Sequence, residues 1–196
     1  CQKDEDTPLP DPNRYYVNMY NFLMEAYDVQ WNINGLDVEP AQAYGIPLLS
    51  FFPLEDSGEN ITIRVLEAGS SQILHSDSCT VEQNNYYMAS LMGSGDDPLL
   101  TCEPMDLRAP SLGKVKLRMM HTAGHLGPID LYVGGSAPEN KLITGVGYGE
   151  VSAYVETTEE QLWESLIITP SNVSPADTTL LSFIANEGFI SGRIYL

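Results

Sequence analysis

Short stretches in which apolar and polar residues alternate dominate the chain, and they restrict it to folds built from strands. Residues 16–20, 61–65 and 115–119 are examples, and an alternation of period two gives a strand one apolar and one polar face. Turn-forming pairs such as Asn34–Gly35 and Gly134–Gly135 separate such stretches. The pattern predicts an all-β protein with antiparallel sheets.

The chain also contains an internal repeat with an offset of 100 residues. Segment 17–35 aligns without a gap on 117–135, and the apolar positions Val17, Met19, Val29, Trp31 and Ile33 fall on Leu117, Met119, Ile129, Leu131 and Val133. The pair Tyr44–Gly45 is followed later by Tyr148–Gly149. Each copy has roughly the length of one β-sandwich, about 100 residues. Two tandem sandwiches are therefore predicted.

The distribution of polar, proline and glycine residues suggests the domain boundaries. We expect a flexible tether at 1–13, a first sandwich at 14–103, a linker at 104–113 and a second sandwich at 114–196. One short helix interrupts the strand pattern, because Thr157–Glu160 has the spacing of a capping box ahead of Gln161–Glu164.

Charge excludes one class of function. The chain has 27 acidic and 9 basic residues and a net charge of -18, so it would be repelled by the phosphates of a nucleic acid. Anionic membrane surfaces are disfavoured for the same reason. A hydrophobic fraction of 43% is sufficient for a packed core and excludes a wholly disordered chain.

The first residues resemble the mature end of a bacterial lipoprotein. Cys1 stands where such proteins carry their covalent lipid, and Lys3, Asp4, Glu5 and Asp6 resemble the export tag of Bacteroidota surface lipoproteins. The resemblance implies a lipid anchor at Cys1, with no other cofactor, and a place on the outer face of the outer membrane. The alternative is an ordinary free thiol or an expression remnant.

An extracytoplasmic location leaves Cys79 and Cys102 available for a disulfide. Such a bridge would close the last strands of the first sandwich and stabilise it by about 3 kcal/mol. Two buried free thiols are the alternative, because the spacing does not give the distance between the two Cα atoms.

No metal site or catalytic residue is predicted. His121 and His125 have the spacing of two ligands on a helix, but Gly124, Pro128 and the flanking strand pattern indicate a strand-to-turn segment, and the repeat aligns His121 with Asn21. A structural role in bonding the backbone is favoured for His121, and a surface loop for His75. Asp96–Asp97 is a weak calcium candidate, since the loop lacks an EF-hand pattern.

Aromatic doublets offer a possible binding surface. In Tyr15–Tyr16, Tyr86–Tyr87 and Phe51–Phe52, one ring should enter the core while its neighbour faces outward. Outward rings could stack on a sugar or anchor a protein partner, but the sequence does not show whether they form one patch.

Residues 115–155 resemble a family of secreted bacterial domains of unknown function. The resemblance rests on Met120–His121, the run Pro128–Val133 and the run Tyr148–Val155. These domains occur as tandem immunoglobulin-like sandwiches on surface lipoproteins, so the expected fold is two tandem immunoglobulin-like antiparallel β-sandwiches. The first copy matches weakly, because Phe51–Phe52–Pro53 departs from the usual ending, and Thr157–Ser165 replaces a short glycine turn.

The resemblance implies a binding function without chemistry of its own. We expect an accessory lipoprotein with protein partners in a TonB-dependent outer-membrane importer of the SusC/SusD type, which takes up nutrients. A glycan-binding or adhesive surface module is the alternative. The sequence Asp177–Thr178–Thr179 resembles a Bacteroidota O-glycosylation site, which predicts an exposed Thr178.

Overall fold

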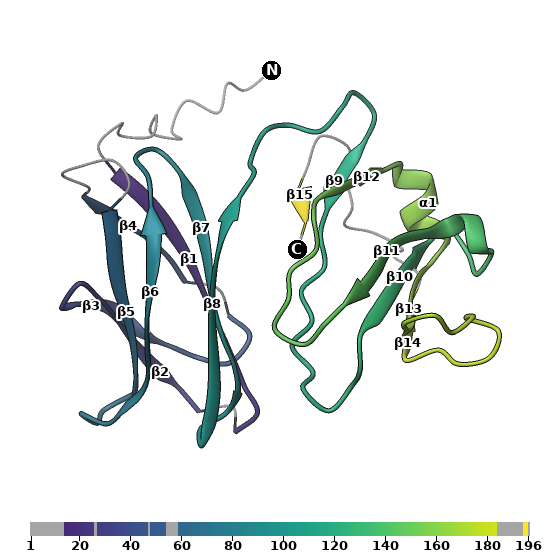
Figure 1. Ribbon diagram of the computed structural model, residues 1–196. Coiled ribbons are helices and arrows are strands. Elements are labelled where there is room, and N and C mark those ends of the chain that lie inside the picture. Colours follow the sequence, from purple (N-terminus) through teal and green to yellow (C-terminus); the bar gives the residue numbers. More distant parts are fainter. Residues whose placement is uncertain (1–13, 26, 47, 54–58, 184–193, 196) are drawn as a thin grey trace. The chain divides into compact units, whose positions relative to one another are not determined.

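The computed structural model describes residues 14–25, 27–46, 48–53, 59–183 and 194–195. The chain divides into two compact units, Cys1–Met105 and Asp106–Leu196, and Figure 1 draws both. Each unit is built from strands, and the described residues contain one α-helix and one 3-10 helix. The all-β fold predicted from the alternating pattern is confirmed.

The first unit has a four-stranded sheet of mixed direction. Its order is β4 (Leu48–Pro53), β1 (Arg14–Leu23), β7 (Tyr86–Ser94) and β8 (Asp97–Met105). β1 pairs with β4 in antiparallel fashion and with β7 in parallel, and β7 pairs antiparallel with β8. Within this sheet, the expectation of antiparallel strands is wrong for the pair β1 and β7, which run in the same direction.

The second sheet of this unit is antiparallel throughout. Its order is β3 (Leu36–Gln42), β2 (Val29–Ile33), β5 (Glu59–Glu67) and β6 (Ile73–Val81). Asn34 and Gly35 form the predicted turn between β2 and β3 with φ values of 50° and 86°. Such positive φ values suit Asn and Gly, the residues that two-residue hairpins prefer.

One hydrophobic core joins the two sheets of the first unit. Every second residue of β1 is buried, and these side chains meet Val29, Trp31 and Ile33 of β2. Ile61, Ile63 and Val65 of β5 belong to the same cluster, and so do Tyr87, Ala89 and Leu91 of β7. Two sheets that share one apolar interior form a sandwich-like unit.

The second unit repeats this order of strands with fewer residues. One sheet has the order β11 (Lys141–Val146), β10 (Ile129–Val133), β13 (Leu166–Pro170) and β14 (Leu181–Phe183). The other has the order β12 (Val155–Thr157), β9 (Val115–Leu117) and β15 (Ile194–Tyr195). Like β1 with β7, β9 pairs with β15 in parallel. A separate core contains Val115, Leu131 and Leu162.

Two short helices lie in the second unit. The 3-10 helix spans Pro138–Asn140, and α1 spans Glu159–Glu164. Thr158 caps α1 as the capping-box spacing predicts: its Oγ1 accepts from the N–H of Gln161, and Oε1 of Gln161 accepts from the N–H of Thr158. Leu162 anchors α1 in the core.

The boundary between the units differs slightly from the expected linker at 104–113. Strand β8 continues through Pro104 and Met105, so these two residues belong to the first unit. The proline is tolerated because β8 is an edge strand, where one N–H of the ladder is dispensable. In the described part of the chain, no helix has the length and apolar character needed to cross a membrane.

Candidate binding surface

Strand β1 separates its side chains into an inner and an outer set. Its odd-numbered residues from Tyr15 to Leu23 are buried, whereas Tyr16, Asn18, Tyr20 and Phe22 are half-buried on the opposite face. Strand β7 continues the pattern, with Tyr87 in the core and Tyr86 on the outer face. The prediction of one ring in and one ring out is confirmed for the doublets Tyr15–Tyr16 and Tyr86–Tyr87.

The outward rings gather because β1 and β7 are neighbours. Tyr16 lies opposite Tyr86 in the register, and the two rings stack with centroids 4.5 Å apart. Tyr20 stacks on Phe22 at 5.6 Å, and Phe22 meets the edge of the Tyr44 ring at 6.4 Å. We call these five side chains the aromatic row. Asn18 lies between Tyr16 and Tyr20 on this face, and its Nδ2 donates to Oη of Tyr20 at 2.9 Å.

Most of the accessible outward side chains of β1 and β7 belong to the aromatic row. Met88, Ser90 and Met92 also face away from the core but are fully buried. Tyr44 is 49% exposed. Among the outward positions of β1 and β7, Arg14 at the start of β1 is the one acidic or basic side chain, although the chain has a charge of -18. The pKa of Tyr86 is raised by burial and then by Tyr16, so its hydroxyl stays protonated.

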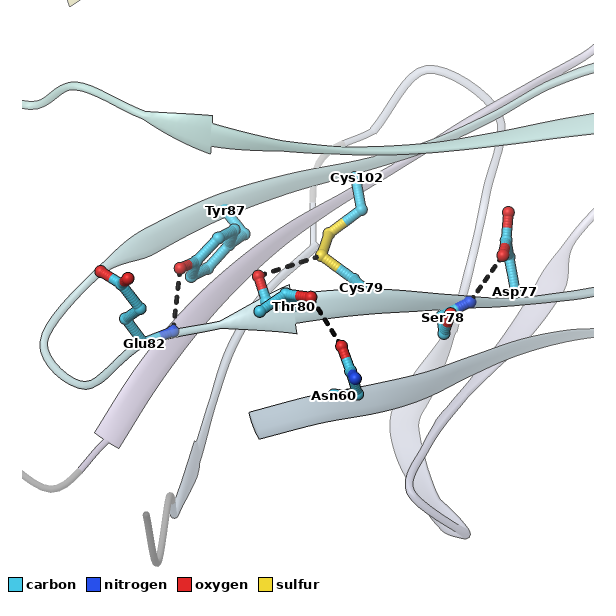
Figure 2. Close-up of a disulfide and its surroundings, with 8 residues drawn as sticks. All are labelled: Asn60, Asp77, Ser78, Cys79, Thr80, Glu82, Tyr87 and Cys102. Carbon is cyan, nitrogen blue, oxygen red and sulfur yellow. Dashed lines mark hydrogen bonds between the residues drawn. A yellow bond between two sulfur atoms is a disulfide. The ribbon is translucent and has the colours of Figure 1, made fainter. Parts of the chain in front are cut away.

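A groove lies at the edge of the same unit, beside the disulfide. Cys79 of β6 and Cys102 of β8 are bonded with their Cα atoms 6.0 Å apart, as Figure 2 shows. The bond joins edge strands of the two sheets, which meet in no backbone ladder there. The groove beside it has a volume of about 510 Å³. Its lining includes Ser78, Thr80, Glu82, Asn85, Tyr86 and Met105.

Hydrogen bonds fix the polar residues of this groove. The N–H of Glu82 donates to Oη of Tyr87 at 2.9 Å, which Figure 2 shows, and Nδ2 of Asn85 donates to Oε2 of Glu82 at 3.0 Å. Thr80 donates from Oγ1 to Oδ1 of Asn60 at 2.6 Å. Burial raises the pKa of Tyr87, the Glu82 N–H lowers it, and the Glu82 charge raises it further.

In the second unit, His121 is buried, and within the described residues both of its ring nitrogens bond the backbone. The N–H of Ala123 donates to Nδ1 at 3.2 Å, and Nε2 lies 3.1 Å from the carbonyl oxygen of Gly127. Because a carbonyl only accepts, the proton must be on Nε2. His125 is exposed on the following turn, so the two imidazoles do not converge. The structural role predicted for His121 fits this geometry.

Asp130 is the most completely bonded carboxylate of this unit. It is fully buried, and it accepts from Nζ of Lys141 at 2.7 Å, from the N–H of Gly145 at 2.7 Å and from the N–H of Asn172 at 3.2 Å. Burial alone would raise the pKa of Asp130, but these donors outweigh it and lower the pKa to about 2. The arrangement ties β10 to two loops.

Three carboxylates gather at one end of the first unit. Glu25, Glu67 and Asp96 lie around Tyr27 and line a pocket of about 310 Å³. The pKa of Tyr27 is raised by burial and then by these three charges. Among the described residues, no group of His, Cys, Asp or Glu side chains has an arrangement that could hold a metal ion. The weak calcium candidate at Asp96–Asp97 gains no support.

The remaining predicted positions are distributed as follows. Cys1 and the segment Lys3, Asp4, Glu5 and Asp6 lie outside the described residues. Thr178 is exposed on the loop between β13 and β14. His75 lies within β6 and is half-buried, so the prediction of a surface loop was wrong, because the alternation of this strand is hidden by its polar run Ser76–Ser78.

Sequence reasoning did not find the aromatic row or the groove. The signal that could have pointed to the aromatic row is that each of the two tyrosine doublets begins an alternating stretch. Their juxtaposition required the parallel pairing of β1 with β7, and a pairing between distant strands is not written in either doublet.

Comparison with known proteins gives no assignment: no protein-family model matches this chain, and no curated protein matches it.

Proposed function

We propose that this chain is a non-enzymatic binding subunit of a cell-surface complex. In this proposal two immunoglobulin-like sandwiches are anchored to the outer membrane through a lipid on Cys1 and serve a TonB-dependent nutrient importer. The observation that carries the binding function is the aromatic row. Half-exposed tyrosine and phenylalanine rings that lie together on one sheet face have the composition of protein contact surfaces, which are enriched in aromatic residues.

The disulfide supports an extracytoplasmic location. Disulfides persist in oxidising compartments and are rare where thioredoxin and glutathione keep thiols reduced. The bond between Cys79 and Cys102 spans the two sheets of the first unit and is part of its architecture. A location outside the cytoplasm is a requirement of the proposed anchor and of any role in uptake.

Chemistry at a catalytic centre would need titratable groups that converge on one cleft. The carboxylates with clearly lowered pKa values are instead engaged in local bonds. Arg108 and then Lys116 hold the pKa of Asp106 far below its usual range, and the hydroxyl and N–H of Ser111 lower that of Glu156.

A pull-down tests the accessory role. The full-length protein is extracted with detergent from the cells that make it, captured, and analysed by mass spectrometry for partners and for acylation of Cys1. We expect a stoichiometric importer with the wild type and its loss with the double variant Phe22→Ala/Tyr86→Ala. Trp163→Ala, which removes an exposed ring from the second unit, is the control. Recovery of the protein alone would contradict the proposal.

A glycan-binding or adhesive module is the second candidate. It is favoured by the spacing of the rings, since residues 16 to 22 of one strand span about 20 Å, the length of several sugar units. Tyrosine rings present apolar faces for stacking and a hydroxyl for hydrogen bonds. A glycan array probed with the full-length protein should then give signals that Phe22→Ala weakens, and an array without signals would remove this candidate.

A further inference from the structure

The groove beside the disulfide has the features of a small-ligand site that is separate from most of the aromatic row. Its volume of about 510 Å³ falls in the range of about 300–1,000 Å³ typical of small-molecule sites. A single ring, Tyr86, belongs both to the row and to the groove. The polar lining comes from the end of β6 and from the turn that follows it.

The Tyr86 ring is held in a fixed plane. One of its faces stacks on Tyr16, with centroids 4.5 Å apart and planes 13° apart, so the other face is the one left for a ligand. The backbone just ahead of Tyr86 is also fixed, because the N–H of Tyr16 donates to the Asn85 carbonyl at 3.0 Å and the N–H of Asn84 donates to the Arg14 carbonyl at 2.7 Å. A preorganised aromatic face lowers the entropy cost of binding.

Hydrogen-bonding groups surround this ring. Glu82 accepts from Asn85 through Oε2, and its Oε1 has no bond to a described residue. Thr80 donates to Asn60, which leaves its oxygen lone pairs as acceptors. The amide of Asn85 has a second N–H and an acceptor oxygen. Donors and acceptors of this kind, placed beside an aromatic face, suit a ligand with many hydroxyl groups and an apolar ring face.

The charge of the groove restricts the ligand further. Of the residues that line it, Glu82 is the only one with an acidic or basic side chain, and no cation offsets it. An anionic ligand would meet this carboxylate and the field of a chain with a charge of -18. A uronic acid, a sialic acid or a phosphate is therefore excluded as the favoured ligand.

We propose that this groove binds one or two units of a neutral hexopyranose glycan, with the sugar ring on Tyr86 and its hydroxyls on Glu82 and Asn85. The inference rests on the second proposed function and names its site and ligand class. Because the groove is open, we expect a Kd on the order of 1 mM for a single short oligosaccharide.

Titration of the purified full-length protein tests this site. The probes are neutral oligosaccharides of glucose, galactose and mannose, followed by amide chemical shifts at concentrations up to about 10 mM, ten times the expected Kd. We expect shifts at residues 78–87 and 102–105. Tyr86→Ala should weaken binding at least about tenfold, and Glu82→Gln about fivefold, as expected for loss of a stacking face and of a charged acceptor.

Two variants serve as controls and separate the outcomes. Glu67→Gln removes one negative charge from the acidic end of the same unit, and Trp163→Ala removes an exposed ring that belongs neither to the groove nor to the aromatic row; both should bind as the wild type does. Binding that depends on Phe22 and not on Glu82 would overturn the groove and keep the glycan function. The absence of binding to every probe, or binding only to an amine such as spermidine, would overturn both.

Discussion

The two units fix the segment after their first strand with the same hydrogen bonds but with different side chains. In the first unit, Oδ1 of Asn21 accepts from the N–H two residues on, at Leu23, and Nδ2 donates to the carbonyl six residues on, at Tyr27. His121 makes the equivalent bonds, also two and six residues on. The carbonyl of each accepts from a later glycine, Gly45 at 2.8 Å and Gly149 at 2.9 Å.

This comparison shows that the backbone geometry, and not the residue type, defines the position. Asn and neutral His both present one acceptor and one donor at a similar separation, so either satisfies the two backbone groups. Strands β2 and β10 begin and end 100 residues apart, which keeps the same segment length in both units. A histidine that looked like a metal ligand is explained by its counterpart in the other unit.

The units differ in what stabilises their interiors. In the first, Trp31 donates through Nε1 to Oε1 of Gln42, which is buried, and a disulfide links the sheets. In the second, Leu131 takes the place of the tryptophan, and Asp130 with Lys141 supplies the polar connection. Each unit contains one of the two tryptophans, Trp31 and Trp163, so single-tryptophan variants report the unfolding of each unit separately.

The largest expected difference comes from removing the disulfide. Cys79→Ala/Cys102→Ala should destabilise the first unit by about 3 kcal/mol, because a closed loop of this length restricts the unfolded chain. The second unit should be unaffected. Urea unfolding followed by Trp31 fluorescence, in a Trp163→Phe background, measures the change. An equal shift of the urea midpoint reported by Trp163 fluorescence would mean that the units do not unfold independently.

Removing the buried carboxylate should have the next largest effect, confined to the second unit. Asp130→Asn should lower its free energy of unfolding by about 2–3 kcal/mol at pH 7, since Lys141 loses its charged partner. Asp177→Asn, at an exposed site, is the matched control.

The same variant has a predictable pH dependence. The pKa of Asp130 is about 2 in the folded protein, below the value of about 3.9 of an unfolded aspartate. Its stabilisation is therefore present above about pH 4 and is lost as the pH falls toward 2. Unfolding curves between pH 7 and pH 2 should show a smaller acid destabilisation for Asp130→Asn than for the wild type. An equal loss of unfolding free energy between pH 7 and pH 2 in Asp130→Asn and the wild type would contradict the stabilising role of the Asp130 carboxylate.

Substitutions at the paired positions test the equivalence of Asn21 and His121 directly. His121→Leu removes two hydrogen bonds between a buried side chain and the backbone and should cost about 2 kcal/mol, as should Asn21→Leu in the first unit. His121→Asn should cost less than about 1 kcal/mol, because the amide retains both bonds. Nitrogen-15 spectra should show the proton of His121 on Nε2. A cost for His121→Asn as large as that for His121→Leu would refute the equivalence.

The smallest effect is expected at Gly45 and Gly149, the glycines whose N–H groups donate to the carbonyls of Asn21 and His121. Gly45 and Gly149 have φ values of 71° and 79°, a conformation that costs other residues about 1 kcal/mol. Gly45→Ala and Gly149→Ala should each destabilise their own unit by about that amount. No other heavy atom lies within 4 Å of the position a Cβ would take at Gly45, so the cost there is purely conformational. Gly127→Ala, at an open site without positive φ, is the control.

The sequence predicted local structure well because local rules control it. Alternation gave the all-β class, Asn34–Gly35 gave a turn, and the spacing from Thr158 to Gln161 gave the cap of α1. The contact of Tyr16 with Tyr86, by contrast, joins residues 70 apart and depends on which strands become neighbours. The groove depends in addition on the bond between Cys79 and Cys102, which spacing alone left open.

The parallel pairing of β1 with β7 has a mechanical consequence. Residues from Tyr16 to Leu23 face Tyr86 to Gly93 in one unbroken register, and β4 flanks the other side of β1. A pull on the chain ahead of Arg14 would load these hydrogen bonds together, in shear, so they would have to rupture collectively rather than one by one. The rate of forced unfolding depends on the height of the unfolding barrier, and collective rupture of these bonds raises it. Strand β1 would therefore resist a force applied to the protein from its N-terminal side.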